Sequence, residues 1–385
     1  MKSSSVLLLC TLNTKLEEAE YLRTQLIEHK IDVRILDVSL ISDSKVLSGV
    51  QKINAMALTS NKAILEVENA IENGVSAIVG LGGGTGGEII LQIMRALPIT
   101  FPKILVTTLP FDPRTAMSDT SIILVPTLAD ICGLNTTLRE VLNNAAAITA
   151  GLCMKKNVEN TFSSGSSIGI TALGATESAI VPLVAALRQK NKETTVFHAN
   201  GYGGAAFARF AERNAFHTII DLTPHELTRL HIAGAHAPMP TRFSVSMDLP
   251  RIVLPGGLNF IGLGEKLLIP EKYLKRDHYE HSGFFTHVKV SETEMIIVAK
   301  ALCDSLNLTK GPTKLIVPMG GFSHQDISGG AIEDENLRNI FLQTVNQNLK
   351  SHIKLVTHNV HISDPEITVS ILNTLEEYSS TNKEY

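Results

Sequence analysis

Aromatic side chains are scarce in this sequence of 385 residues: they make up 5% of it, and tryptophan is absent. Aliphatic residues must therefore supply most of the core, since hydrophobic residues as a group reach 44%. Aliphatic cores are typical of parallel sheets buried on both faces and argue against a β-sandwich. A chain of this length usually forms more than one hydrophobic core, so we expect two domains.

Cysteine is also rare, with four residues and no CxxC pair. This spacing argues against zinc and disulfide frameworks and fits free thiols in a reducing compartment. No apolar run reaches the ~18 residues of a membrane span. The segment MKSSSVLLLC has an apolar run that is too short for a signal peptide. We therefore expect a cytoplasmic protein with no membrane partner.

The sequence also has no excess of basic residues: it contains 34 lysines and arginines and 38 acidic residues, for a net charge of -4. No basic stripe with interleaved aromatics occurs, which argues against nucleic acid as a partner. No GxSxG elbow or kinase signature is present. Residues 277–287, DHYEHSGFFTH, hold three histidines but lack HExxH spacing, so we expect a surface loop there and no metal site.

Strands and helices alternate along the whole sequence, which predicts βαβ units and parallel sheets. We expect two Rossmann-like, doubly wound α/β domains, 1–160 and 161–385, joined by the polar segment 157–167, and a frayed tail over 379–385. The expected strands are residues 5–10, 31–39, 75–82, 103–110, 121–126, 167–173, 194–200, 218–222, 251–255, 313–319 and 353–358. The expected helices are residues 15–29, 61–73, 88–97, 134–156, 179–190, 205–215, 291–307 and 334–349.

A glycine-rich loop follows the strand 75–82. Its residues are Gly82, Gly83, Gly84, Thr85, Gly86 and Gly87. The loop matches GxGxxG between a strand and a helix, where backbone N–H groups can receive an anion. Glu88 stands where a Walker A loop has lysine, and the third strand is not the dinucleotide position. We favour a phosphate cradle over a tight turn.

Polar residues also follow the first two strands. Lys15 falls in the first turn of the first helix, where the helix dipole disfavours a cation unless an anion lies nearby; a capped helix with a solvated lysine is the alternative. Asp37 ends the second strand, where dinucleotide folds often bind ribose. Lys62 begins the next helical segment and could face a phosphate.

Loops of the second half form a second candidate site, because they follow strands whose carboxyl ends share one sheet edge. The candidates for binding are Thr176, Asn200, Gly201, Gly203 and Gly204. The titratable candidates for catalysis are Glu177, His198 and His324. For each residue taken alone, a structural role is the alternative.

Six segments occur in an order that resembles one family: TLNTKLEEAEYL, GLGGGTGG with MRALPITFPKILVTTLP, ITALGATES, VFHANGYGG, LPGGLNF and PMGGFSHQDISGG. It is the family of ATP-binding proteins related to the N-terminal inhibitory domain of the tomato mosaic virus resistance protein, with mostly uncharacterised bacterial members. The resemblance implies two Rossmann-like subdomains, Mg-ATP in the first, and homodimers. Some relatives are fused to, or found beside, a TIM-barrel protein of the phosphoenolpyruvate hydrolase-like class. Lys15 matches the family's first-loop lysine, the loop from Gly82 to Gly87 its phosphate loop, and Lys62 is the nearest match to an arginine.

The sequence thus predicts a protein that binds ATP and Mg²⁺ in its first domain. The second domain is expected to bind a small carboxylate or phosphate compound. Two alternatives stay open: a non-catalytic regulatory or scaffold module whose partner contact depends on ATP, and an NAD(P)-dependent enzyme. The sequence names neither a reaction nor a substrate.

Overall fold

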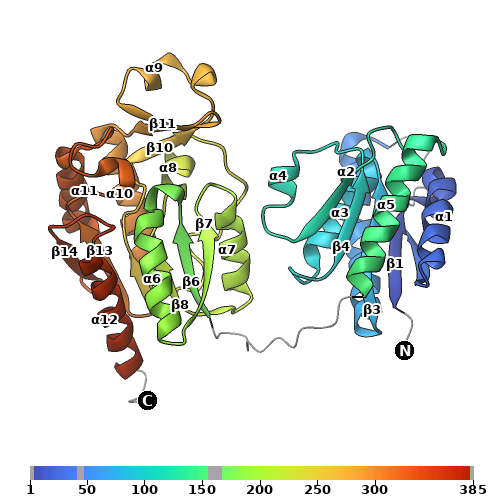
Figure 1. Cartoon of the computed structure of the whole chain (residues 1–385), viewed down its shortest axis with the longest axis horizontal. Coiled ribbons are helices and arrows are strands. Elements are labelled where there is room, and N and C mark those ends of the chain that lie inside the picture. The colour runs from blue at the N-terminus through green and yellow to red at the C-terminus, as the bar shows by residue number, and fades with distance from the viewer. Residues whose placement is uncertain (1–3, 41–46, 155–166, 382–385) are drawn as a thin grey trace. The chain divides into compact units, whose positions relative to one another are not determined.

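The chain contains two parallel sheets, each covered by helices on both faces, and a small antiparallel sheet (Figure 1). They belong to two compact units, Met1–Glu159 and Asn160–Tyr385. The computed structural model describes residues 4–40, 47–154 and 167–381. The expected linker lies outside the described residues, except for Ser167, which begins a strand. The two α/β domains expected from the alternation are thus present.

The sheet of the first unit is fully parallel and has the order β2-β1-β3-β4-β5. Its strands are β1 (Ser5–Cys10), β2 (Asp32–Asp37), β3 (Val75–Gly82), β4 (Lys103–Thr107) and β5 (Ile122–Pro126). Because β1 lies between β2 and β3, the strand order reverses at the β1–β3 pair. Ligands of open α/β sheets bind outside the carboxyl ends of the strands at this switch point.

Alternation along β1 explains how the helices cover the sheet. Val6 and Leu8 pack into one core with α1 and α5, while Leu7 and Leu9 pack into another with α2 and α3. Successive side chains of a strand point to opposite faces, so each core belongs to one face. The helices are α1 (Leu12–Glu28), α2 (Gly49–Glu72), α3 (Gly84–Ala96), α4 (Pro113–Ala116) and α5 (Thr136–Cys153).

The second unit has a six-stranded parallel sheet, in the order β14-β13-β9-β8-β6-β7. Its strands are β6 (Ser167–Ala172), β7 (Glu193–His198), β8 (Phe216–Asp221), β9 (Arg251–Val253), β13 (Thr313–Pro318) and β14 (Lys354–His358). Here the order reverses at the β6–β8 pair. The switch point of this sheet therefore lies beside the loops after β6 and β8.

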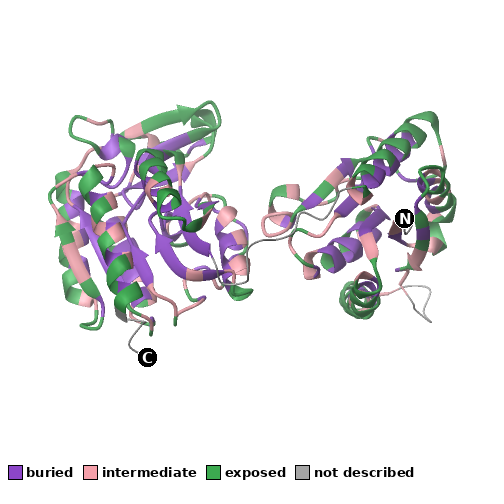
Figure 2. Ribbon diagram, turned by 60° about the horizontal axis from the view of Figure 1, so that its bottom comes forward, coloured by how far each residue is buried: buried purple, intermediate pink, exposed green. Residues whose placement is uncertain are grey.

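Helices cover both faces of this sheet as well, and its inner strands β6, β8, β9 and β13 are buried (Figure 2). Ile168 and Ile170 pack with α6 and α12 on one face, and Ile219 packs with α7 on the other. Met295 and Phe341 bring α10 and α11 to a further core cluster. The helices are α6 (Glu177–Gln189), α7 (Gly203–Glu212), α8 (Glu226–His231), α9 (Glu271–Leu274), α10 (Glu292–Leu306), α11 (Glu335–Asn348) and α12 (Pro365–Thr381).

Three expectations about local structure were wrong. The run 277–287 is not a loop: its residues enter β11 (His278–Ser282) and β12 (Phe285–Lys289), which pair with β10 (Phe260–Leu263) in an antiparallel sheet. The tail 379–385 is helical as far as it is described, because α12 extends to Thr381. Helix α2 begins at Gly49, well before residue 61, since a capping box of Ser48 and Gln51 starts it.

No helix in the described ranges is both long enough and apolar enough to span a bilayer.

Candidate functional site

The glycine-rich loop lies at the switch point of the first sheet. Strand β3 ends at Gly82 and α3 begins at Gly84, so the helix starts inside the loop. Its N-cap residue is Gly83, which has no side chain to accept a hydrogen bond from the first turn. The first N–H groups of a helix have no intrahelical partner and carry the positive end of the helix dipole. This helix start is therefore suited to an anion.

The start of α1, at the same switch point, is different. The backbone N–H of Leu12 donates to Asp37 Oδ1 at 3.1 Å, and the N–H of Asn13 donates to Ser39 Oγ at 3.2 Å. Burial alone would raise the pKa of Asp37, but hydrogen bonds from Ser39 and Leu12 outweigh it and lower this pKa below 3.8. Asp37 therefore caps α1, and the interpretation of this carboxylate as a ribose ligand finds no support in its contacts.

The glycines of the loop fall into two groups when a Cβ atom is built on each. At Gly82 it would lie 2.5 Å from Gly87 N, and at Gly86 it would lie 3.1 Å from Thr11 Cγ2. These glycines allow the strand, the helix and the β1 loop to pack closely. At Gly84 a Cβ would meet nothing within 4 Å, and at Gly83 only Thr108 Oγ1 at 3.6 Å. Packing within the protein therefore explains Gly82 and Gly86 but not Gly84.

A cavity of ≈ 670 Å³ opens beside Gly84 and Thr85. This volume is in the usual range for small-molecule sites. Phe111 and Leu91 give it apolar wall, and the carboxylates of Glu88 and Asp112 also line it. Another cavity of the first unit, of ≈ 370 Å³, follows β4 and β5 and is lined by Thr108. Open space thus lies along the carboxyl edge of this sheet.

The two lysines expected at this site are placed elsewhere. Lys15 is half-buried at a kink in α1, and its ammonium donates to the carbonyl oxygen of Ile131. It does not line the cavity beside Gly84. Lys62 is exposed in the middle of α2, about 20 Å along the axis from the start at Gly49 at the usual helical rise. The expectation that Lys62 begins a helix was wrong, because α2 starts earlier.

The second unit contains a cavity of ≈ 300 Å³ at its own switch point. Of the candidate residues, His198 and Asn200 line it. Residues that follow β6 and β8, and residues of the antiparallel sheet, also line this cavity. They were not predicted as site residues from the sequence. These additional residues include His225, Arg229, His281 and His287. His281 and His287 come from the histidine-rich run 277–287, so that run was a usable signal.

Rings stack along the wall of this cavity. His281 lies over His287 with ring centroids 4.9 Å apart, and His287 lies over Phe260 at 4.1 Å. Burial, together with the neighbouring His281, lowers the pKa of His287 to about 4. Burial and the Arg229 charge lower the pKa of His225 well below 6.5. His225 and His287 are therefore neutral at physiological pH and cannot supply positive charge.

The remaining second-site candidates have structural contacts. Thr176 is buried, and its hydroxyl hydrogen-bonds with Thr223 Oγ1 at 2.8 Å. A Cβ at Gly201, Gly203 or Gly204 would lie within 2.6 Å of protein atoms. The side-chain oxygen of Asn200 accepts from the N–H groups of Tyr202 and Gly203, at the start of α7.

The proposed titratable groups do not form one cluster. Glu177 begins α6 and His324 begins a short 3-10 helix (His324–Asp326), and both are exposed. Neither lines the cavity that contains His198. Burial, Arg229 and His281 lower the pKa of His198 below 6.5. Of the three candidates for catalysis, only His198 is among the described residues that line this cavity.

A buried ionic cluster fills the carboxyl end of β8. Both Nη atoms of Arg242 donate to Asp221 at 2.8 Å, and Nη2 also lies 3.3 Å from Glu226 Oε2. Thr171 Oγ1 donates to Asp221 at 2.6 Å. All three charged side chains are almost completely shielded from solvent.

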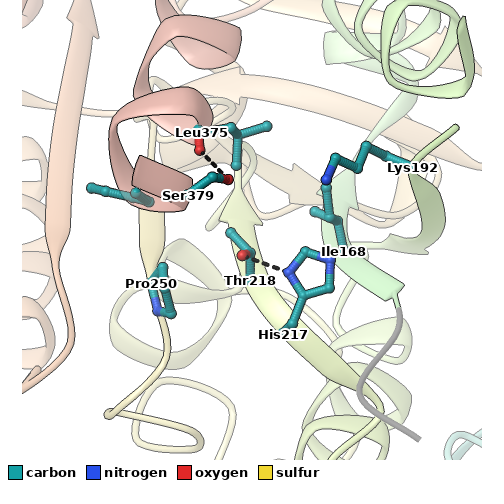
Figure 3. A pocket seen from close by; sticks show the side chains of 8 residues that line it. Ile168, Lys192, His217, Thr218, Pro250, Leu375 and Ser379 are labelled. Carbon is teal, nitrogen blue, oxygen red and sulfur yellow. Dashed lines mark hydrogen bonds between the residues drawn. The ribbon is translucent and has the colours of Figure 1, made fainter. Parts of the chain in front are cut away.

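A small cavity lies at the opposite end of the second sheet (Figure 3). It has a volume of ≈ 120 Å³ and is bordered by the amino ends of β6 and β8. His217 and Thr218 line this cavity, and His217 Nδ1 and Thr218 Oγ1 are hydrogen-bonded at 2.8 Å. Parallel sheets bind ligands at the carboxyl edge, so this amino-edge cavity is no candidate site.

No group of three or more His, Cys, Asp or Glu side chains suited to a metal ion occurs in the described part of the chain. His281 and His287 of the histidine-rich run 277–287 line the ≈ 300 Å³ cavity of the second unit.

Comparison with known proteins covers both units. Residues 41–158 match the Uncharacterised protein family (UPF0261) N-terminal domain, and residues 166–379 match its C-terminal domain. A UPF0261 protein of Clostridium tetani is 28% identical, over 97% of this chain and 98% of its own length. A UPF0261 protein of Rhizobium meliloti is 32% identical, over 76% of this chain and 74% of its own length.

A plant protein is similar to the same chain. The ToMV resistance protein Tm-1(GCR237) of Solanum lycopersicum is 25% identical, over 86% of this chain but only 45% of its own length. The resemblance to the tomato protein's family is thereby confirmed. With both of its domains matched along most of the sequence, the chain belongs to the Uncharacterised protein family (UPF0261).

Proposed function

We propose that the first unit binds Mg-ATP, with the phosphates at the N-terminus of α3. The observation that carries this proposal is the open, uncapped helix start at Gly84. It lies at the switch point of the sheet, where ligands of this architecture bind. The neighbouring α1 start is already occupied by Asp37 and Ser39, so α3 offers the free anion site of the pair.

The lining of the adjacent cavity supports a magnesium complex. Glu88 lies on α3 shortly after the helix start and lines the cavity together with Gly84. A bare phosphate would be repelled by this carboxylate, whereas Mg²⁺ is commonly bound by one or two carboxylates together with phosphate oxygens. Phe111 offers an aromatic face in the same cavity, which suits a nucleotide base.

Calorimetry with Mg-ATP, Mg-ADP and NAD on the full chain tests this proposal. A Gly84→Val variant adds a side chain in open space, so it should fold normally and weaken ATP binding by roughly tenfold or more. The matched control is Gly49→Val. Gly49 is likewise the first residue of a helix with nothing within 4 Å of a built Cβ.

Two outcomes would overturn nucleotide binding at this loop: no nucleotide binds to the wild type, or Gly84→Val and Gly49→Val bind ATP equally well. Preference for NAD over ATP would replace the ligand with a dinucleotide. If ATP binds, a phosphate-release assay separates an ATP-consuming enzyme from a regulatory module. The homodimer and the TIM-barrel partner stay predictions, which chromatography with and without ATP can test.

A further inference from the structure

The ≈ 300 Å³ cavity of the second unit contains a buried arginine that forms no ion pair with a described carboxylate. Arg229 is 7% exposed and lines the ≈ 300 Å³ cavity. Its Nη1 donates to the carbonyl oxygen of Ala235 at 2.9 Å, and its Nε has no hydrogen-bond partner in the described structure. Arg229 forms no ion pair with any described residue, although the nearby Arg242 forms two. Burying this charge is costly; the Glu226 carboxylate, although too far away for an ion pair, offsets part of the cost, and an anionic ligand would offset more of it.

The free edge of this guanidinium lies beside a second unpartnered nitrogen. His225 is fully buried and lines the same cavity, and its Nε2 has no hydrogen-bond partner. A Cβ built on Gly262 would lie 2.6 Å from Arg229 Nη2 and 3.0 Å from His225 Nε2. Both nitrogens therefore border the same point on β10, within reach of one small molecule.

The hydrogen bond at Nδ1 of His225 determines which ligand groups can contact Nε2 on the other side of the ring. His225 Nδ1 lies 2.7 Å from the carbonyl oxygen of Gly257, which can only accept a hydrogen bond. Nδ1 therefore carries the proton, and Nε2 of the neutral ring presents a lone pair. A ligand group that contacts Nε2 must be a donor, such as a hydroxyl.

The chemistry of the lining favours one class of anion. No Asp or Glu side chain lines the cavity, and Arg229 is its sole lysine or arginine. The Nε–Nη2 edge of a guanidinium matches the two oxygens of a carboxylate. A phosphate would bring more acceptor oxygens than this edge can pair.

We propose that this cavity binds a small hydroxycarboxylate, whose carboxylate pairs with Arg229 and whose hydroxyl donates to His225 Nε2. All residues of this site belong to the second unit, so the proposal does not depend on whether the first unit binds a nucleotide. The narrow volume of ≈ 300 Å³ restricts the ligand to a small molecule.

Calorimetry on the full chain with four acids and inorganic phosphate tests the proposal. Glycolate and lactate carry the hydroxyl, and acetate and propionate are the same molecules without it. We expect the hydroxy acids to bind about tenfold more tightly than their partners, as one buried hydrogen bond would give. Phosphate should bind more weakly than the hydroxy acids. Weaker or absent binding of both hydroxy acids relative to phosphate, or no preference for the hydroxyl, would overturn the proposal.

Variants then assign the contacts. Arg229→Met should abolish binding of all four acids, and Arg229→Lys should weaken it, since lysine keeps the charge but loses the fork. His225→Phe keeps a ring beside Phe260, 4.6 Å away in the wild type, and should remove only the hydroxyl preference.

The matched control for these variants is Arg251→Met. Arg251 is also buried and donates to backbone carbonyl oxygens, but it lies outside the cavity. Thermal melting of each variant verifies that it folds. Unchanged affinities in Arg229→Lys and His225→Phe, or an equal loss in Arg251→Met, would refute this assignment even if Arg229→Met does not fold.

Discussion

The carboxyl edges of the two sheets are built in opposite ways. In the first unit the edge at the switch point is bare backbone: α3 starts at Gly84, where a side chain would meet nothing. In the second unit the side chains of Arg242, Asp221 and Glu226 fill part of the corresponding edge, beside the ≈ 300 Å³ cavity. After β7, a Cβ at Gly203 would lie 2.1 Å from the carbonyl oxygen of His198. Glycine-rich loops after parallel strands can thus serve ligand access or close packing, and the space around each glycine distinguishes the two.

Of the comparisons between the two units, the buried ionic cluster of the second unit against an exposed ion pair of the first should give the largest difference in stability. Arg242→Met leaves Asp221 and Glu226 buried without their cation, which should cost about 3–5 kcal/mol of unfolding free energy. Removing Arg23 from its exposed ion pair with Glu20 in the first unit should cost less than about 1 kcal/mol. Denaturant unfolding measures the loss of unfolding free energy in both variants. Equal losses would contradict the conclusion that the buried ionic cluster stabilises the second unit.

The glycines provide the next comparison. Gly203→Ala forces a methyl group against the backbone of His198 and should lower the unfolding free energy by about 1–3 kcal/mol. Gly84→Ala, which adds its methyl group in open space, should change it by less than about 1 kcal/mol in either direction. Thermal unfolding compares the two directly. A larger loss in Gly84→Ala would mean that the first loop, too, is held by packing.

The smallest effect concerns the cap of α1. Asp37→Asn should lower stability at neutral pH by about 1 kcal/mol, because the charged acceptor for Leu12 N–H and Ser39 is lost. The folded-state pKa of Asp37 lies below 3.8, so its contribution is complete above 3.8 and is lost as the pH falls through the folded value. Unfolding measured over this pH range should show the two proteins converging in acid. A constant difference would assign the loss to another cause.

The order of elements could be read from the sequence, whereas the sites could be read only in part. Strand β3 was predicted with its observed limits because an apolar run ends at a glycine cluster. The strand order could not be predicted, since periodicity does not say which strands pair. That order places the third strand at a switch point, the place where ligands of open α/β sheets bind.

Arg229 and His225 were missed for a physical reason. Charged and polar side chains are usually exposed, so a polar stretch such as TPHELTR gives no sign that it will be buried. Its burial depends on β10 and β12, which are remote in sequence and form a separate small sheet. Asp37 was noticed, but its role depends on the N–H groups of α1, which only the folded chain brings to it.

The position of β11 has a consequence for how this protein family can diverge. The strand lies at the edge of the small sheet, four of its five residues are exposed, and His281 and Ser282 border the cavity. Arg229 and His225, in contrast, follow a strand of the main sheet. Mutations in β11 can therefore reshape the mouth of the cavity with little cost to folding. Evolution could change which molecules enter while the anchoring residues stay the same.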